Sequence, residues 1–239
     1  MLNLAAALLP ALLLLMYFCK KDAYPEPTHL IVKTFFLGCL TVIPVLLLAL
    51  PFLPTVEAVT DPLMRAVQTA FLMAAVPEEL MKWTVVFFYC AKKSEFDEPM
   101  DGFVYGATAS LGFAALENIL YVADGGLGVA LLRAFTAVPA HAVFGAVMGY
   151  FIARAIFMDP TRRRWNLLLS LAVPTFLHGI YNSSLMYLDF LDEAQLEALG
   201  GLVLLPFIVF LVTLVGSWIW VRRLLARAVE EQAMMEAES

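Results

Sequence analysis

Two adjacent glutamates and a lysine interrupt a stretch of the chain that is otherwise mostly apolar. Glu78, Glu79 and Lys82 lie between residues 64 and 90. A charge at the centre of a membrane costs about 2.5–3.5 kcal/mol on insertion scales, so such residues indicate a functional site. On a helix Glu78 and Lys82 share a face and can pair, whereas Glu79 is turned away by about 100° and lacks a local partner. Pro77 removes one backbone N–H and is expected to loosen the helix at this point.

Three further apolar stretches each carry polar residues of the kind that enzymes use. Glu117 and Asn118 are neighbours in GFAALENILY, and His141 lies in VPAHAVFG. His178 and Asn182, in PTFLHGIYN, are four residues apart and share one face of a helix. Counting along each helix at about 1.5 Å per residue places all these stretches at compatible depths, in the middle to outer half of a membrane. We expect these residues and the glutamate pair to line one water-filled cavity.

This inventory of side chains suits hydrolysis. A glutamate can act as a general base on water, imidazoles can serve as metal ligands or electrophiles, and an amide can bind an oxyanion. A set of histidines and glutamates can hold a zinc ion with an open position for water. Without a metal, a glutamate in an apolar site can activate water itself. Taken singly, each residue also has a structural explanation, as a packing histidine or an interfacial polar pair.

The composition places these residues in an integral membrane protein. Of the 239 residues, 62% are hydrophobic and 15% are charged, whereas a soluble domain is nearer to about half and about a quarter. We expect an all-α, polytopic bundle, with one transmembrane domain at 1–221 and a cytoplasmic tail at 222–239. About seven apolar segments are long enough to cross a hydrocarbon core of about 30 Å, namely residues 2–18, 30–54, 64–90, 102–122, 127–157, 165–188 and 201–221.

The lysines and arginines predict how this bundle is oriented. Of the 15, twelve lie in alternate loops or after the last segment, and the intervening loops are acidic or neutral. The positive-inside rule makes the first side cytoplasmic, so the N-terminus is expected outside and the C-terminus inside. Arg65 and Arg133 lie near outer helix ends and can reach the interface, so only Lys82 lies well inside the membrane.

Five short motifs follow one another on separate predicted helices. They are EExxK at 78–82, DG-x2-YG at 101–106, GFxxxEN at 112–118, P-x-H at 139–141 and HxxxN at 178–182. In this order, and with the loop K-x-D-x-x-x-E-P at 20–27, they resemble the PrsW family of intramembrane proteases over residues 15–190. More distantly, EExxK and HxxxN are similar to the EExxxR and HxxxN motifs of the CAAX prenyl endopeptidases and their bacterial relatives, with the basic residue one position nearer to the glutamates. Lysine replaces arginine here, and Glu117-Asn118 stands where those enzymes carry a histidine, so prenyl-protein specificity is not expected.

The resemblance implies hydrolysis of a peptide bond within or just outside a bacterial cytoplasmic (inner) membrane. The implied substrate is a single-span membrane protein such as an anti-sigma factor, whose first cut begins a cascade that frees a sigma factor. No stretch is basic and aromatic enough to bind nucleic acid, so the expected partners are this substrate and the lipid bilayer. The functional residues that carry over are Glu78, Glu79, Glu117, His141, His178 and Asn182.

In the expected mechanism, either Glu78 or Glu79 deprotonates the attacking water, and we favour Glu78. Glu79 then orients the water or binds a metal, and Lys82 keeps the non-catalytic glutamate charged. His178 with Asn182 polarises the developing oxyanion. The family has been described both as metalloproteases and as glutamate-dependent proteases, so zinc stays open, with an expected ligand set of Glu79, Glu117, His141 and His178.

Two other functions use the same residues. A proton- or cation-coupled transporter would use the buried carboxylates and histidines as a relay, although the chain is short and shows no sequence repeat. A catalytically silent scaffold would use them only to fix the packing of the helices.

Overall fold

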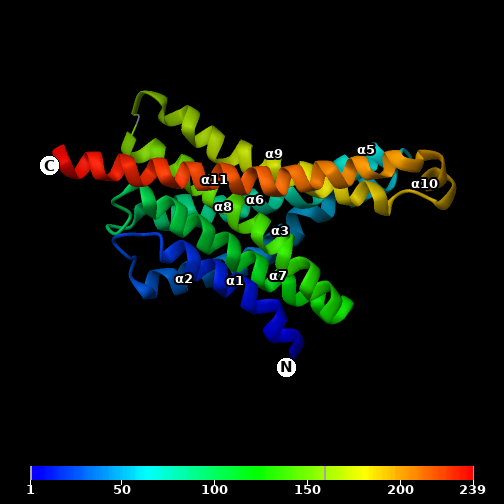
Figure 1. Ribbon diagram of the computed structural model, residues 1–239, viewed down its shortest axis with the longest axis horizontal. Coiled ribbons are helices and arrows are strands. Elements are labelled where there is room, and N and C mark those ends of the chain that lie inside the picture. The colour runs from blue at the N-terminus through cyan, green and yellow to red at the C-terminus, as the bar shows by residue number, and fades with distance from the viewer. Residues whose placement is uncertain (1, 159, 239) are drawn as a thin grey trace.

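All regular elements of the computed structural model are helical over the residues that it describes, 2–158 and 160–238 (Figure 1). This confirms the all-α class. The N-terminal half contains α1 (Leu2–Cys19), α2 (Thr28–Leu40), α3 (Val42–Ala49), α4 (Leu53–Glu57), α5 (Pro62–Gln68), the π-helix η2 (Thr69–Ala75) and α6 (Val76–Phe88). The C-terminal half contains α7 (Pro99–Phe135), α8 (Ala137–Ala153), the π-helix η4 (Arg154–Met158), α9 (Arg163–Asp189), α10 (Glu193–Leu199) and α11 (Leu204–Glu238). Short 3-10 turns join several of them, at Leu50–Phe52, Cys90–Lys92, Pro160–Arg162 and Gly200–Val203.

Helices α7 and α8 form the centre of the bundle, and their backbones touch. A Cβ added to Gly106 would collide with the carbonyl oxygen of Gly145, and one added to Gly149 with the carbonyl oxygen of Gly102. Small residues four apart allow this close approach of helices in membranes. Helices α1 and α2 pack on α7, α9 packs on α8, and α11 packs on α9. Nearly all of α8 and the first half of α7 are therefore buried.

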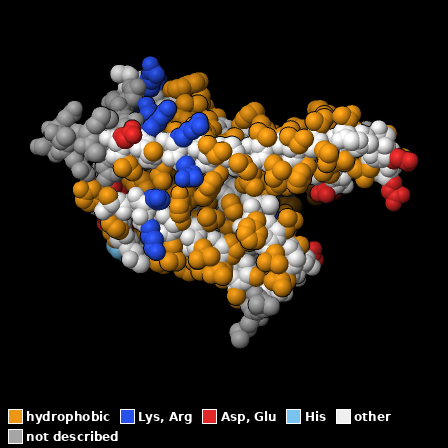
Figure 2. Space-filling model, viewed as in Figure 1, with side chains coloured by type: hydrophobic (Ala, Val, Ile, Leu, Met, Phe, Trp, Pro, Cys, Tyr) orange, Lys and Arg blue, Asp and Glu red, His pale blue; other side chains and the backbone are white. Residues whose placement is uncertain are grey.

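The outer surface of the bundle is apolar, as a lipid-facing surface must be. Many large hydrophobic side chains of α1, α3 and α11 are exposed, and hydrophobic atoms cover most of the face seen in Figure 2. Lysine and arginine side chains gather towards one end of that face, and acidic side chains lie on α10 at the other end. Among the described residues, four helical runs are long and apolar enough to cross a membrane: Thr28–Glu57, Pro99–Phe135, Ala137–Phe157 and Glu193–Glu230. The chain is thus an integral membrane protein, while seven spans and the N-out orientation stay predictions.

The predicted fifth segment, 127–157, is not one helix. Gly126 has φ 69° and ψ −159°, a conformation that only glycine adopts readily, and the chain reverses there. A second break follows at Thr136 (φ −123°, ψ −79°), after which α8 begins. Residues 127–135 therefore form a short arm that folds back beside the earlier part of α7. Helix α11 continues without a break to Glu238, past the predicted start of the cytoplasmic tail at residue 222, and the division into a transmembrane domain and a tail stays a prediction.

The helix that carries the glutamate pair is widened just before it. Residues Thr69–Ala75 form a π-helix that runs directly into α6 and Pro77. Proline cannot donate the backbone hydrogen bond that the preceding turn would accept, so the helix loosens there, as the sequence predicted. π-Helical turns of this kind are frequent at functional sites because they redirect the side chains that follow.

Candidate active site

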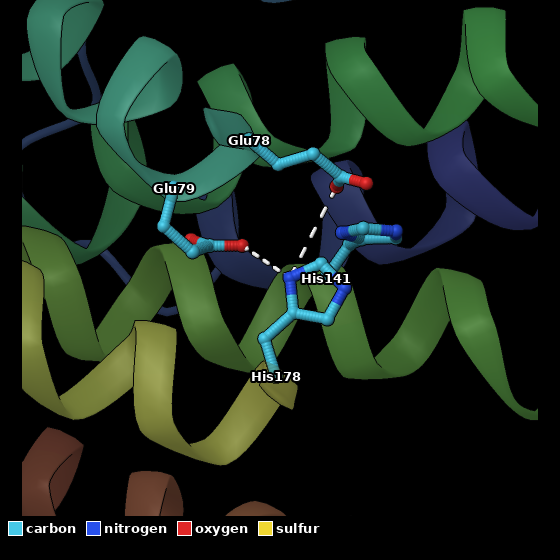
Figure 3. Close-up of side chains that lie close together, drawn as sticks. All are labelled: Glu78, Glu79, His141 and His178. Carbon is cyan, nitrogen blue, oxygen red and sulfur yellow. Dashed lines mark hydrogen bonds and ion pairs between the residues drawn. The ribbon is translucent and has the colours of Figure 1, made fainter. Parts of the chain in front are cut away.

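Three helices bring four of the predicted polar residues to one place in the bundle. Glu78 and Glu79 come from α6, His141 from α8 and His178 from α9, and Figure 3 shows their side chains pointing towards one another. One oxygen or nitrogen atom of each lies within 4.8 Å of the corresponding atoms of the other three. All four side chains are buried. The convergence expected from the sequence is therefore present for these residues.

Lys82 lies at the centre of this group. Its Nζ is 3.0 Å from Oε2 of Glu78, 2.9 Å from Oε1 of Glu79 and 3.0 Å from Nδ1 of His141. The Nζ also lies 4.2 Å from the centre of the Phe113 ring, a favourable cation–π distance. The expectation that Glu79 lacks a local partner is wrong, because residues three apart on a helix are also neighbours. One ammonium thus compensates both carboxylates.

His178 is held through both ring nitrogens. Its Nδ1 lies 2.8 Å from Oε1 of Glu79 and 4.0 Å from Oε2 of Glu78, and its Nε2 lies 3.1 Å from Nδ2 of Asn182. An amide nitrogen only donates and a carboxylate only accepts. The network therefore assigns the proton to Nδ1, which donates to Glu79, and Nε2 accepts from Asn182. Glu79 fixes the imidazole from one side and Asn182 from the other.

Glu117 lies behind His141 and not among the four converging groups. Its Oε2 accepts hydrogen bonds from Nε2 of His141 at 3.0 Å and from Nη2 of Arg133 at 2.6 Å. Arg133 also donates from Nε to Oδ1 of Asn118, at 2.9 Å. Asn118 in turn donates to the carbonyl oxygen of Ala7 on α1, at 2.8 Å. Glu117 thus orients His141, and Asn118 ties α1 to α7.

Arg133 is the site residue that the sequence did not predict. The interpretation that it reaches the membrane interface overlooked the fold of α7. On an unbroken helix the sixteen residues between Glu117 and Arg133 would span about 24 Å. The reversal at Gly126 brings their side chains into contact instead. A glycine pair followed by an arginine was the only sequence signal for this contact.

A cavity of about 330 Å³ opens onto one side of the cluster. Its polar lining includes Glu78, Glu117, His141, His178 and Asn182. Glu79 and Lys82 are not part of the lining, and both side chains have no exposed surface. Of the two adjacent carboxylates, Glu78 is therefore the one that faces the space where water and a substrate can enter.

The donor set fits a metal ion in its chemistry. Glu78, Glu79, His141 and His178 offer two carboxylates and two imidazoles, which are common zinc ligands. In addition, Oε2 of Glu79 is buried and accepts no hydrogen bond, as expected for an atom with a ligand still to bind. This set includes Glu78 where the sequence analysis expected Glu117. A metal among these atoms would lie close to Lys82, whose ammonium is within 3.0 Å of three of the four ligands.

Comparison with known proteins shows the family to which the chain is similar. A family model described as PrsW family intramembrane metalloprotease matches residues 26–217. The chain is 41% identical over 180 residues to Protease PrsW of Geobacillus kaustophilus, covering 75% of this chain and 77% of that protein. It is 39% identical over 212 residues to Protease PrsW of Bacillus subtilis, covering 87% and 89%. Protease PrsW of Clostridioides difficile is 30% identical over 186 residues, covering 75% and 77%.

No solved structure matches the chain. The family match, which covers most of the chain, does not favour the transporter alternative. The match includes every residue of the buried cluster, from Glu78 to Asn182. The chain therefore belongs to the PrsW family of intramembrane metalloproteases, and it is a protease.

Proposed function

We propose that this protease cleaves a single-span protein of the bacterial cytoplasmic membrane, with Glu78 as the general base. The observation that carries the assignment is the difference between the two glutamates: Glu78 lines the cavity, and Glu79 is sealed behind it with Lys82. A general base must lie within hydrogen-bond reach of the water that it deprotonates. Glu78 lines the cavity, so a water molecule in the cavity can lie within hydrogen-bond reach of its carboxylate.

The first step is the addition of water to the substrate carbonyl. Glu78 takes a proton from the water while its oxygen attacks the carbonyl carbon. Lys82, bonded to Glu78 at 3.0 Å, places a positive charge beside this carboxylate and stabilises negative charge there. The proton on Glu78 then passes to the departing amine as the carbon–nitrogen bond breaks. The glutamate thus ends the cycle as it began.

Asn182 is the proposed donor to the oxyanion. Its amide nitrogen carries two protons, and one is used on Nε2 of His178. The other can reach the cavity, which Asn182 lines. His178 itself has no N–H left for the substrate, because Nδ1 donates to Glu79. We therefore assign His178 to positioning, between Glu79 and Asn182.

A metal held by Glu78, Glu79, His141 and His178 would supply Lewis-acid polarisation of water or of the carbonyl group. Two residues outside this set, Glu117 and Arg133, have a role that holds in either case, because they orient His141. Because the family is named for metalloproteases, zinc is the metal to test first.

The proposed substrate class is a membrane-spanning anti-sigma factor cut near the outer face. The cavity is lined by the end of α7, the beginning of α8 and the end of α9, and these ends are external if the positive-inside rule holds. An extended peptide segment just outside a transmembrane helix can reach Glu78 from this side. The apolar residues Leu132, Tyr181 and Leu185 line the same cavity and would contact its side chains.

The decisive experiment compares Glu78→Gln with Glu79→Gln on a co-expressed, epitope-tagged single-span substrate. We expect Glu78→Gln to abolish cleavage while the protein accumulates and unfolds normally. Glu79→Gln should also abolish cleavage, but with lowered stability, because it disturbs both Lys82 and His178. The matched control is Glu197→Gln, on the exposed surface of α10, which should cleave normally. Normal cleavage by Glu78→Gln would exclude this residue as the base.

A further inference from the structure

A second group of carboxylates lies far from the cavity, and the protease mechanism does not use it. Asp22 belongs to the loop after α1, Glu98 caps the N-terminus of α7, and Asp101 lies in the first turn of α7. One carboxylate oxygen from each lies within 4.8 Å of the other two. Along α7, Asp101 precedes Glu117 by sixteen residues, or about 24 Å. The group is thus separate from the intramembrane cluster.

Two of the three carboxylates are almost completely buried. Asp22 is 7% exposed and Asp101 is 1% exposed. Among the described residues, neither forms an ion pair with a lysine or arginine. Glu98 is partly exposed and connects the group to solvent. Burying an ionised carboxylate without a compensating charge costs free energy. The three carboxylates are therefore expected to bind either a cation or protons.

Helix capping explains only part of this arrangement. Asp101 accepts backbone hydrogen bonds from Asp97 at 2.7 Å and Glu98 at 2.8 Å, and Glu98 completes the capping box. Asp22 comes from a different loop and takes no part in the cap. Its Oδ1 accepts the backbone N–H of Tyr24 at 2.9 Å, but its Oδ2 is buried and accepts no hydrogen bond. That orphaned oxygen, in a side chain held against Glu98 and Asp101, points to a missing ligand.

We propose that Asp22, Glu98 and Asp101 bind a hard divalent cation, Mg²⁺ or Ca²⁺. Both ions prefer carboxylate oxygens, and oxygens on one Ca²⁺ can lie up to about 5 Å apart. Water would complete the coordination shell from the exposed side of Glu98. The bound ion would join the loop after α1 to the start of α7, and so hold together the two helices that Asn118 links at greater depth. This site is independent of the proposed proteolytic function.

The test uses the full chain purified in detergent and freed of metal with a chelator. Thermal unfolding is measured with and without millimolar Mg²⁺ or Ca²⁺, and binding is measured with Mn²⁺ as a paramagnetic probe. We expect one of the two ions to raise the Tm of the wild type by several degrees, and to displace Mn²⁺. Asp22→Asn should weaken binding at least tenfold and lose the shift in Tm. Asp97→Asn, which changes an exposed acid next to Glu98 in the loop before α7, should behave as the wild type.

Two further variants keep the outcome clear. Glu79→Gln, in the intramembrane cluster, should still bind Mn²⁺ at Asp22, Glu98 and Asp101. This variant distinguishes binding at the loop site from binding at the intramembrane cluster. Glu98→Gln replaces Asp22→Asn if the latter fails to fold, as judged by circular dichroism. Two observations together would overturn the proposal. In the first, the Tm of the wild type does not depend on either ion. In the second, neither Asp22→Asn nor Glu98→Gln reduces Mn²⁺ binding. A Tm that rises from pH 8 to pH 6 without any response to ions would also overturn it, since shared protons would then hold the carboxylates.

Discussion

Glu79 and His178, 99 residues apart in the chain, are joined by a buried hydrogen bond of 2.8 Å. The same oxygen of Glu79 also accepts from Lys82, at 2.9 Å. This carboxylate therefore connects the lysine of its own helix to the histidine of α9. Breaking either connection leaves a charge in a site that water does not reach, so the pair is as important for stability as for chemistry.

The first prediction concerns Lys82. Lys82→Met removes the ammonium between two carboxylates and should destabilise the protein by about 3–5 kcal/mol, the usual cost of breaking a buried ion pair. Glu79→Gln added to it should restore part of the loss, because one of the two unpaired carboxylates is then neutral. The free energy of unfolding of both variants, measured in detergent, checks this. If the double variant is no more stable than Lys82→Met, Glu79 and Lys82 do not compensate each other in the folded protein.

The second prediction concerns metal affinity. The ammonium of Lys82 lies within 3.0 Å of Glu78, Glu79 and His141, where it repels a cation and competes for the same lone pairs. Lys82→Met should therefore retain more zinc than the wild type, by elemental analysis after dialysis against a fixed zinc concentration. Lys82→Met combined with His178→Ala, which lacks one donor, should lose that gain. Equal zinc content in wild type and Lys82→Met would show that the lysine does not occupy the metal position.

The sequence predicted that the helices carrying Glu78, His141 and His178 meet, for a simple physical reason. Charged and polar side chains in apolar helices are costly unless they contact one another, so Glu78, His141 and His178 had few alternatives to a common site. Their similar depths along the helices made one cavity the simplest arrangement. The all-α class followed equally directly from the length and hydrophobicity of the segments.

What the sequence could not predict depends on backbone geometry. The contact of Glu117 with Arg133 requires the reversal at Gly126, which lies between the predicted segments 102–122 and 127–157, and a second break at Thr136, through which the apolar pattern continues. The contact of Glu117 with His141 depends on how closely α7 and α8 approach, which their facing glycines set. The sequence identified the same glutamates and histidines, but it could not show how they are arranged. Only the structure shows that Glu117 lies behind His141 and that Glu78 lines the cavity.

The third prediction tests the reversal in α7. Gly126→Ala forces a residue with a Cβ into a backbone conformation that only glycine adopts readily, at a cost of about 1–3 kcal/mol. It should displace Arg133 from Glu117 and lower the cleavage rate. Gly128→Ala is the matched control, since that glycine has a helical backbone and no atom within 4 Å of an added Cβ. Equal cleavage and Tm in the two variants would argue against the reversal.

The fourth prediction tests the contact between α7 and α8. Gly106→Ala places a methyl group against the carbonyl oxygen of Gly145, and a backbone atom cannot rotate out of the way. The helices must separate, so we expect a loss of about 1–3 kcal/mol in the free energy of unfolding. Cleavage should fall as well, because Glu117 and His141 lie on the two helices that move apart. In Gly179→Ala the obstacle is only the end of the Phe71 ring, which can turn aside, so its stability should change less. If Gly106→Ala unfolds like the wild type, the two backbones do not touch at this point, and His141 would have to be positioned by other contacts.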